Sequence, residues 1–213
     1  MRRVSPAEII ALLQQRLYLA QGAPALVDTI EGDHPTARKA AVLLPFFEQE
    51  GELYLAFIRR ASTLRAHSGE IAFAGGGIDA TDSSPVAAAL REAEEEIGLA
   101  IEHSEVLGIL SPVFTVVSNY LITPVVAYLP QGLGRVQLQE SEVAELILAP
   151  LRGLADTAIA HTEEWARDGI TRTVYFYDYK NYRIWGATGR ILAMLLELLQ
   201  DVWREDDTES ADM

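Results

Sequence analysis

The sequence contains no cysteine in its 213 residues. Disulfide bonds, thiolate nucleophiles and zinc sites built on cysteine are therefore excluded. Long hydrophobic runs are also missing, because apolar stretches such as Ile122–Leu129 are far too short to span a bilayer. Arg2 and Arg3 are followed by Ser5-Pro6-Ala7-Glu8, which is typical of a helix N-terminus rather than of a secretory leader. We therefore expect a cytoplasmic protein without a membrane partner.

Basic residues are scarce: 17 lysines and arginines stand against 31 aspartates and glutamates, which gives a net charge of −14. A polyanion would be repelled, so we expect no nucleic-acid partner. The acidity fits a protein that binds divalent cations, and it fits equally well one that is merely kept soluble. Five of the acids gather at the C-terminus, where they predict a solvated tail: Glu205, Asp206, Asp207, Glu209 and Asp212.

Helix and strand patterns alternate along the chain, and they predict one α/β domain without repeats or dividing linkers. Strands are expected over Ala40–Phe47, Leu53–Ile58, Val106–Leu110, Ile122–Tyr128, Ala144–Leu148, Thr173–Tyr177 and Tyr182–Trp185. Helices are expected after the Ser5 cap and over Pro85–Ile97, Leu154–Ala160 and Gly189–Trp203. Residues 21–38 are expected to form a loop, and residues 59–84 to be mostly irregular.

The helix predicted over Pro85–Ile97 has a signal at each end. Ser84 fits the N-cap, Pro85 the first helical position, and Gly98 the left-handed position after the last turn. At about 100° per residue the apolar stripe consists of Val86, Leu90, Ala93 and Ile97. Roughly opposite lie Glu92, Glu95 and Glu96, while Glu94 falls at the edge of the stripe.

Glu92, Glu95 and Glu96 crowd one helical face and repel one another. Cations between them would offset this repulsion, and hard carboxylate oxygens suit Mg²⁺ or Mn²⁺. Arg91 lies four residues before Glu95 and can hold that carboxylate in place. The alternative is an ordinary solvated face. The glycines Gly75, Gly76 and Gly77, shortly before the helix, favour the metal site, because a glycine-rich turn can bring backbone N–H groups close to an anion.

These residues resemble the Nudix hydrolases, whose box joins a glycine and a glutamate to Arg-Glu, an apolar residue, Glu-Glu and a glycine. The matching residues are Gly76, Arg91, Glu92, Ala93, Glu95, Glu96, Gly98 and Leu99. Asp82 stands in place of the first glutamate, with one extra residue before Arg91, and is not among the expected metal ligands. The extension Arg60–Phe73, with Thr123–Val126 and Ile184–Leu192, resembles the coenzyme A diphosphatase subgroup.

The resemblance implies an α/β/α sandwich with a mixed sheet and a catalytic loop-helix-loop. Residues 1–37 would form an N-terminal helix and loop, 38–204 the Nudix domain, and 205–213 the acidic tail. The implied reaction is metal-dependent hydrolysis of coenzyme A or a derivative to 3′,5′-ADP and 4′-phosphopantetheine. The alternatives are hydrolysis of ADP-ribose or another nucleoside-diphosphate derivative, and a non-catalytic nucleotide-sensing module. A homodimer is also expected, as in many superfamily members.

The resemblance also assigns roles to residues. The expected catalytic residues are Arg91, Glu92, Glu95, Glu96 and Glu142. Glu92, Glu95 and Glu96 are the metal ligands in this assignment, and Glu92 can instead help to deprotonate the attacking water. Glu142 is expected to act as the general base or as an extra metal ligand. Alternatively, it is only a solvated acid in a loop. The expected substrate-binding residues are Arg60, Arg65, His67, Gly75 and Gly76.

Overall fold

The computed structural model describes residues 4–18, 34–63, 67–167 and 169–202. Its largest unit is a sheet formed by the strands β1 (Arg38–Gln49), β2 (Glu52–Arg60), β3 (Ile71–Ala72), β4 (Ala74–Gly77), β5 (Glu105–Ile109), β6 (Val113–Thr115), β7 (Tyr120–Tyr128) and β8 (Val143–Pro150). The central order is β3-β2-β1-β7-β5, while β4 pairs with β1, β6 with β7 and β8 with β2. Because β1 and β7 are parallel and the other pairs antiparallel, the sheet is mixed.

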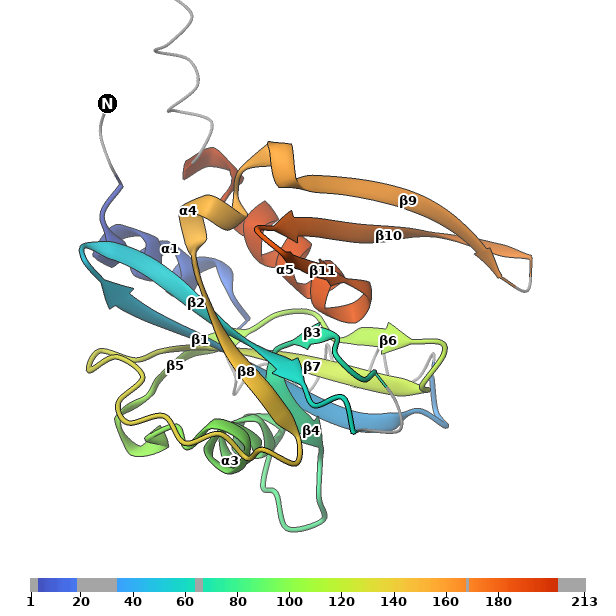
Figure 1. Ribbon diagram of the computed structural model, residues 1–213, viewed down its shortest axis with the longest axis horizontal. Helices are drawn as coiled ribbons and strands as arrows, with labels where there is room; N and C mark the ends of the chain where they lie inside the picture. The colour runs from blue at the N-terminus through green and yellow to red at the C-terminus, as the bar shows by residue number, and fades with distance from the viewer. Residues whose placement is uncertain (1–3, 19–33, 64–66, 168, 203–213) are drawn as a thin grey trace, which may run out of the picture.

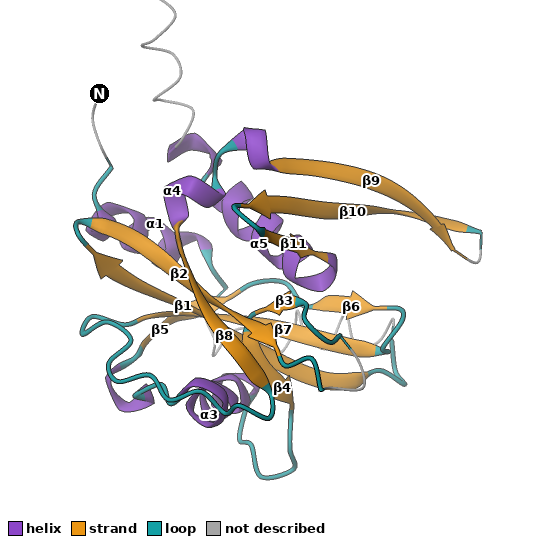
Figure 2. Cartoon of the chain, in the orientation of Figure 1, coloured by secondary structure: helices purple, strands orange, loops and turns teal. Residues whose placement is uncertain are grey.

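Helices cover both faces of this sheet (Figures 1 and 2). The helix α3 (Pro85–Ile97) packs over β4 and β1 on one face. The opposite face is covered by α1 (Pro6–Arg16) and α5 (Gly186–Leu198), and the short helix α4 (Leu151–Leu154) follows β8. The layers are therefore those of an α/β/α sandwich, as predicted.

Strand β1 shows why the sheet is buried on both sides. Its side chains alternate between two hydrophobic clusters: Leu43 and Phe47 join the cluster under α3, whereas Leu44 and Phe46 join the cluster under α1 and α5. All four are at most 4% exposed. Alternate residues of a strand point to opposite faces, so a nearly continuous apolar run is what a doubly covered strand requires.

A second, three-stranded sheet lies beside α5 and contains β9 (Ala160–Arg167), β10 (Ile170–Tyr179) and β11 (Tyr182–Trp185) in the order β11-β10-β9. Its edge strand β11 contacts β3 of the main sheet. The side chains of Arg59, Glu145 and Tyr182 join the two sheets, because Glu145 accepts a hydrogen bond from the Tyr182 hydroxyl at 2.6 Å and pairs with Arg59 at 2.9 Å.

Most predicted elements are present, including the helix capped by Ser5, whose side chain and Glu8 form a reciprocal capping box. Residues 59–84 are mostly irregular as predicted, but they also contain the short strands β3 and β4, which were not predicted. One prediction is wrong: the segment Leu154–Ala160 is not one helix but the end of α4, the 3₁₀ turn Thr157–Ile159 and the start of β9. Strand β9 was not predicted, because both of its faces are exposed and its sequence therefore lacks the alternation of apolar and polar residues.

Most of the loop expected over residues 21–38, Arg65 and the expected acidic tail lie outside the described residues. The division into residues 1–37, 38–204 and 205–213 stays a prediction. Among the helices that the structure describes, none is long and apolar enough to cross a membrane.

Candidate active site

Helix α3 is fixed at both ends, and this sets the position of the acidic residues on its last turns. The hydroxyl of Ser84 accepts a hydrogen bond from the Ala87 N–H at 3.2 Å, and Gly98 adopts the left-handed conformation with φ 67°. The loop before β8 completes the C-terminal end, because the N–H of Gln139 donates to the Glu96 carbonyl at 2.9 Å. The predicted caps are therefore confirmed.

The buried side of α3 differs from the predicted stripe. Ala93 and Ile97 are buried as expected, but Val86 and Leu90 are only partly buried. Glu96 was placed on the solvent side, and this is wrong, since it is 3% exposed. The helix turns its alanines, Ala88, Ala89 and Ala93, toward the sheet, and small side chains allow a close approach that brings Glu96 inward with them.

Glu96 is held between α3 and β4. Its carboxylate accepts a hydrogen bond at 2.9 Å from the N–H of Gly75. Only glycine fits there, because φ is 151° and a Cβ would stand 2.3 Å from the Ala41 carbonyl oxygen. The glycine segment is thus a strand paired with β1 and not the turn that was predicted, and the N–H of Gly75 serves a carboxylate of the protein itself.

Burial raises the pKa of Glu96 to about 7, against the lowering effects of the Gly75 N–H and the Arg60 charge. The carboxylates of Glu92 and Glu142 raise it further. A buried carboxyl group surrounded by other acids favours its neutral form, and a bound cation would reverse that preference.

Glu92 lies one helical turn before Glu96, and 17% of its side chain is exposed. Burial raises its pKa, and Arg91 opposes this rise. Its carboxylate lies over Gly76, where a Cβ would come within 2.6 Å of Glu92 Oε2. The glycine at position 76 therefore leaves room for a carboxylate.

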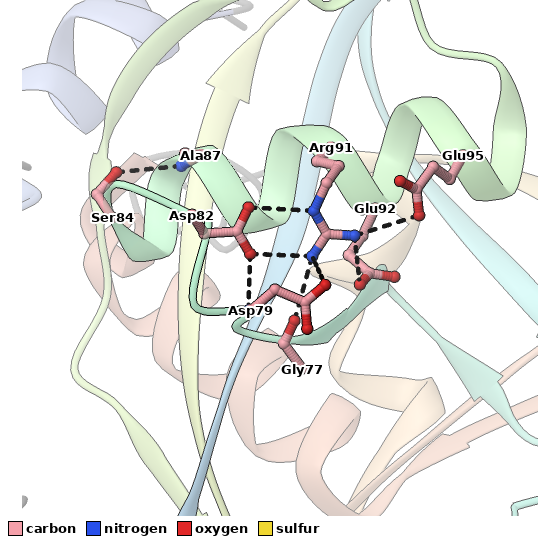
Figure 3. Close-up of polar contacts among 8 residues, drawn as sticks. All are labelled: Gly77, Asp79, Asp82, Ser84, Ala87, Arg91, Glu92 and Glu95. Carbon is pink, nitrogen blue, oxygen red and sulfur yellow. Dashed lines mark hydrogen bonds and ion pairs between the residues drawn. The ribbon is translucent and has the colours of Figure 1, made fainter.

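Arg91 connects the acidic residues of α3 to the loop before it (Figure 3). Its guanidinium donates to Asp82 through two nitrogens, at 3.1 and 3.0 Å, to Glu92 at 2.9 Å, and to Glu95 at 3.2 Å. It also donates to the Gly77 carbonyl at 3.3 Å. The contact with Glu95 is the one that the spacing predicted.

Asp82 has the role of orienting Arg91. Its side chain is 6% exposed and also accepts a hydrogen bond from the Asp79 N–H at 2.8 Å. The Arg91 guanidinium is the main cause that lowers the pKa of Asp82. This role could not be predicted from the sequence, because Asp82 lies in the loop before α3 and its contact with Arg91 follows no helical spacing.

Arg60 and Glu142 approach the site from the ends of β2 and the loop before β8. The N–H of Ala61 donates to the Glu142 carbonyl at 2.8 Å, which holds the two segments together. The Glu142 side chain is exposed. The Arg60 Nε is buried and has no hydrogen-bond acceptor among the described residues. Both charges act on Glu96, so both side chains lie within electrostatic reach of it.

His67 lies in the turn between β2 and β3. It has a positive φ of 57°, and its Nδ1 is 2.9 Å from Glu70 Oε2. Half-exposed and engaged with Glu70, it shapes this turn. Its predicted contact with phosphate is not tested by the structure.

No three Asp, Glu or His side chains in the described ranges form a ready-made metal cage. Arg91 engages one oxygen each of Glu92 and Glu95. Mg²⁺ is commonly held by one or two carboxylates together with water and substrate phosphates, so a complete protein cage is not required. The buried Glu96, raised in pKa beside Glu92 and Glu142, supplies hard oxygen donors of the type that fit such an ion.

Comparison with known proteins gives the family. The model of the NUDIX domain matches residues 37–169. The chain belongs to the Nudix hydrolases. It is 40% identical over 163 residues to a Photorhabdus laumondii protein named "Uncharacterized Nudix hydrolase NudL", covering 76% of this chain and 86% of the relative. The protein of that name from Citrobacter koseri is 36% identical over 166 residues, with 78% and 85% covered.

Among solved structures, the MutT protein from Methanosarcina mazei Go1 matches with a TM-score of 0.47 and 17% identity, over 79% of this chain and 94% of that one. Nudix hydrolases act on the diphosphate bonds of phosphorus-containing anhydrides. They generally use divalent metals such as Mg²⁺ or Mn²⁺.

The neighbouring glycines of β4 provide a matched pair of variants. Gly76→Ala should push the Glu92 carboxylate away and lower kcat by roughly 100-fold, the scale on which a misplaced group costs activity. Gly77→Ala should retain activity, because a Cβ there meets nothing within 4 Å. Steady-state hydrolysis and thermal unfolding of both variants test this. Equal losses of activity in the two variants would contradict the placement of Glu92.

The raised pKa of Glu96 predicts the pH dependence of stability. The unfolded chain ionises Glu96 near its ordinary pKa of 4.5, whereas the folded chain does so near about 7. Between these values the folded state binds more protons, so its stability should fall as pH rises, by about 3 kcal/mol at most from this residue. Urea unfolding in EDTA should show this fall in the wild type and a smaller one in Glu96→Gln. Identical pH profiles would refute it.

Proposed function

We propose that this chain hydrolyses the diphosphate bond of coenzyme A or a close derivative with Mg²⁺ or Mn²⁺, releasing 3′,5′-ADP and 4′-phosphopantetheine. The observation that carries diphosphate hydrolysis is the buried carboxylate of Glu96, raised in pKa beside Glu92 and Glu142. The choice of coenzyme A rests on the resemblance of the segment Arg60–Phe73 to that subgroup.

In this proposal Glu92, Glu95 and Glu96 would hold the metal. When bound, the metal would neutralise phosphate charge and lower the pKa of the attacking water. Arg91 keeps Glu92 and Glu95 at fixed positions, at 2.9 and 3.2 Å, and Asp82 keeps Arg91 itself in place.

The attacking water must lose a proton, and we propose Glu142 as the acceptor of that proton. The Glu142 side chain is exposed and lies within electrostatic reach of Glu92 and Glu96. Among the described contacts of the site, no side chain donates a hydrogen bond to its carboxylate. Water oxygen forms a new bond to phosphorus, the bridging P–O bond breaks, and the leaving phosphate departs with the bond's electrons. Glu142 takes the proton.

The substrate phosphates would be bound by arginines at the end of β2 and on the segment after it. Arg60 has a buried Nε without a protein acceptor, and a phosphate oxygen would supply one. Arg65 and His67 are proposed as further phosphate contacts, the latter through the ring nitrogen that does not face Glu70. Gly76 contributes by leaving room for the Glu92 carboxylate, and Gly75 contributes by lying close to β1 while its N–H holds Glu96.

A substrate panel, run with Mg²⁺ and with EDTA, tests the proposal. It would contain coenzyme A, acyl-coenzyme A, ADP-ribose, NADH, diadenosine polyphosphates and nucleoside triphosphates. We expect Mg²⁺-dependent cleavage with the highest kcat/KM for coenzyme A or its acyl derivative. A preference of about tenfold or more for another compound would refute the substrate, and tight binding without any product would refute catalysis.

The same assay includes variants of α3. Glu95→Gln and Glu96→Gln should abolish Mg²⁺-dependent turnover while circular dichroism stays unchanged. Glu94→Gln is the matched control, because Glu94 is exposed on the same helix and outside the proposed site. Full activity in the first two variants would show that Glu95 and Glu96 are not needed for catalysis.

A further inference from the structure

The strand β9 presents an uncovered edge. It is the outer strand of the three-stranded sheet, while β11 at the other edge faces the main sheet (Figure 1). Among the described residues β10 is its only strand partner. All eight of its residues are exposed, and it lacks the proline, lysine or bulge that commonly protects such an edge. A row of open N–H and C=O groups is a template for another strand.

One face of β9 also carries aromatic side chains. His161 stacks on Phe176 with ring centroids 4.9 Å apart, and Trp165 lies 5.7 Å from Trp185. Trp165 remains 46% exposed. Glu163 and Arg167 share this face, because alternate residues of a strand point the same way. The edge therefore carries an apolar group at Trp165, with an acid on one side of it and a base on the other.

We propose that β9 pairs with β9 of a second copy of this chain, antiparallel about a two-fold axis through Trp165. This register places Trp165 opposite its copy and Glu163 opposite Arg167 of the second chain, and symmetry repeats that pair. Glu164, on the other face, lies opposite Ala166. Opposite charges and aromatic groups across strands stabilise a sheet, and an interface of this kind is self-complementary.

The registers centred on Glu163, Glu164 and Thr162 fit less well. An axis at Glu163 or at Glu164 places a glutamate against itself, which destabilises a strand pair. An axis at Thr162 avoids this clash but places Trp165 opposite Ile159, which lies before the start of β9 and outside the strand pair. The axis at Trp165 both covers the exposed indole and pairs each Glu163 with a permanently charged arginine. The small sheets of two copies would then form one continuous antiparallel sheet.

The first test is the mass of the full chain in solution by light scattering. We expect a dimer of twice 23.4 kDa. Glu163→Arg should give a monomer, since it opposes Arg167 with a like charge, and adding Arg167→Glu should restore the dimer. Glu164→Arg is the control that should leave the dimer intact, because it faces Ala166. A wild-type monomer up to high micromolar concentration, or a dimer insensitive to Glu163→Arg, would overturn the proposal.

The second test uses the absence of cysteine from the chain. A cysteine at the axis would face its copy with Cα atoms about 5 Å apart, within reach of a disulfide. Mild oxidation of Trp165→Cys should therefore yield a covalent dimer, whereas Thr162→Cys, whose copies would be about 20 Å apart, should not. No cross-link in the first variant, or an equal one in both, would contradict this register. Circular dichroism confirms that each variant is folded.

Discussion

A carboxylate buried between a helix and a strand is the constraint on which the rest of the site depends. Glu96 is accommodated because Gly75 has no side chain and offers its N–H, and because three alanines let α3 lie close to the sheet. Removing a charged group from water is costly unless it is paired. The raised pKa of about 7 expresses that cost. A site that keeps such a group beside two other acids is suited to a divalent cation.

Arg91 holds the other carboxylates of the site in place. One guanidinium spans Asp82, Glu92 and Glu95, so that carboxylates from the loop and from the helix are held around a single positive charge. Asp82 is the fixed end of this clamp, since two of its hydrogen bonds come from Arg91 and one from the Asp79 backbone. Asp82, which stands where the Nudix box has a glutamate, therefore positions Arg91.

The sequence correctly predicted features that depend only on neighbouring residues, namely the ends of α3 and one ion pair along it. Ser84 and Gly98 mark the ends of α3 because caps satisfy nearby backbone groups, and the contact between Arg91 and Glu95 follows from helical spacing. Glu96 was misplaced because helical angles give the spacing of side chains but not which side the sheet will cover. Strand β4 was missed because three glycines show no side-chain alternation, and β9 because it is exposed on both faces.

The most direct measurement is the titration of the Glu96 carboxyl group by ¹³C NMR in protein labelled at glutamate, assigned with Glu96→Gln. We predict a pKa near 7 in EDTA, and a clear decrease when Mg²⁺ is added, because a bound cation favours the carboxylate. An ordinary glutamate pKa in EDTA would contradict the burial of Glu96. A raised pKa that does not respond to Mg²⁺ would contradict its role as a metal ligand.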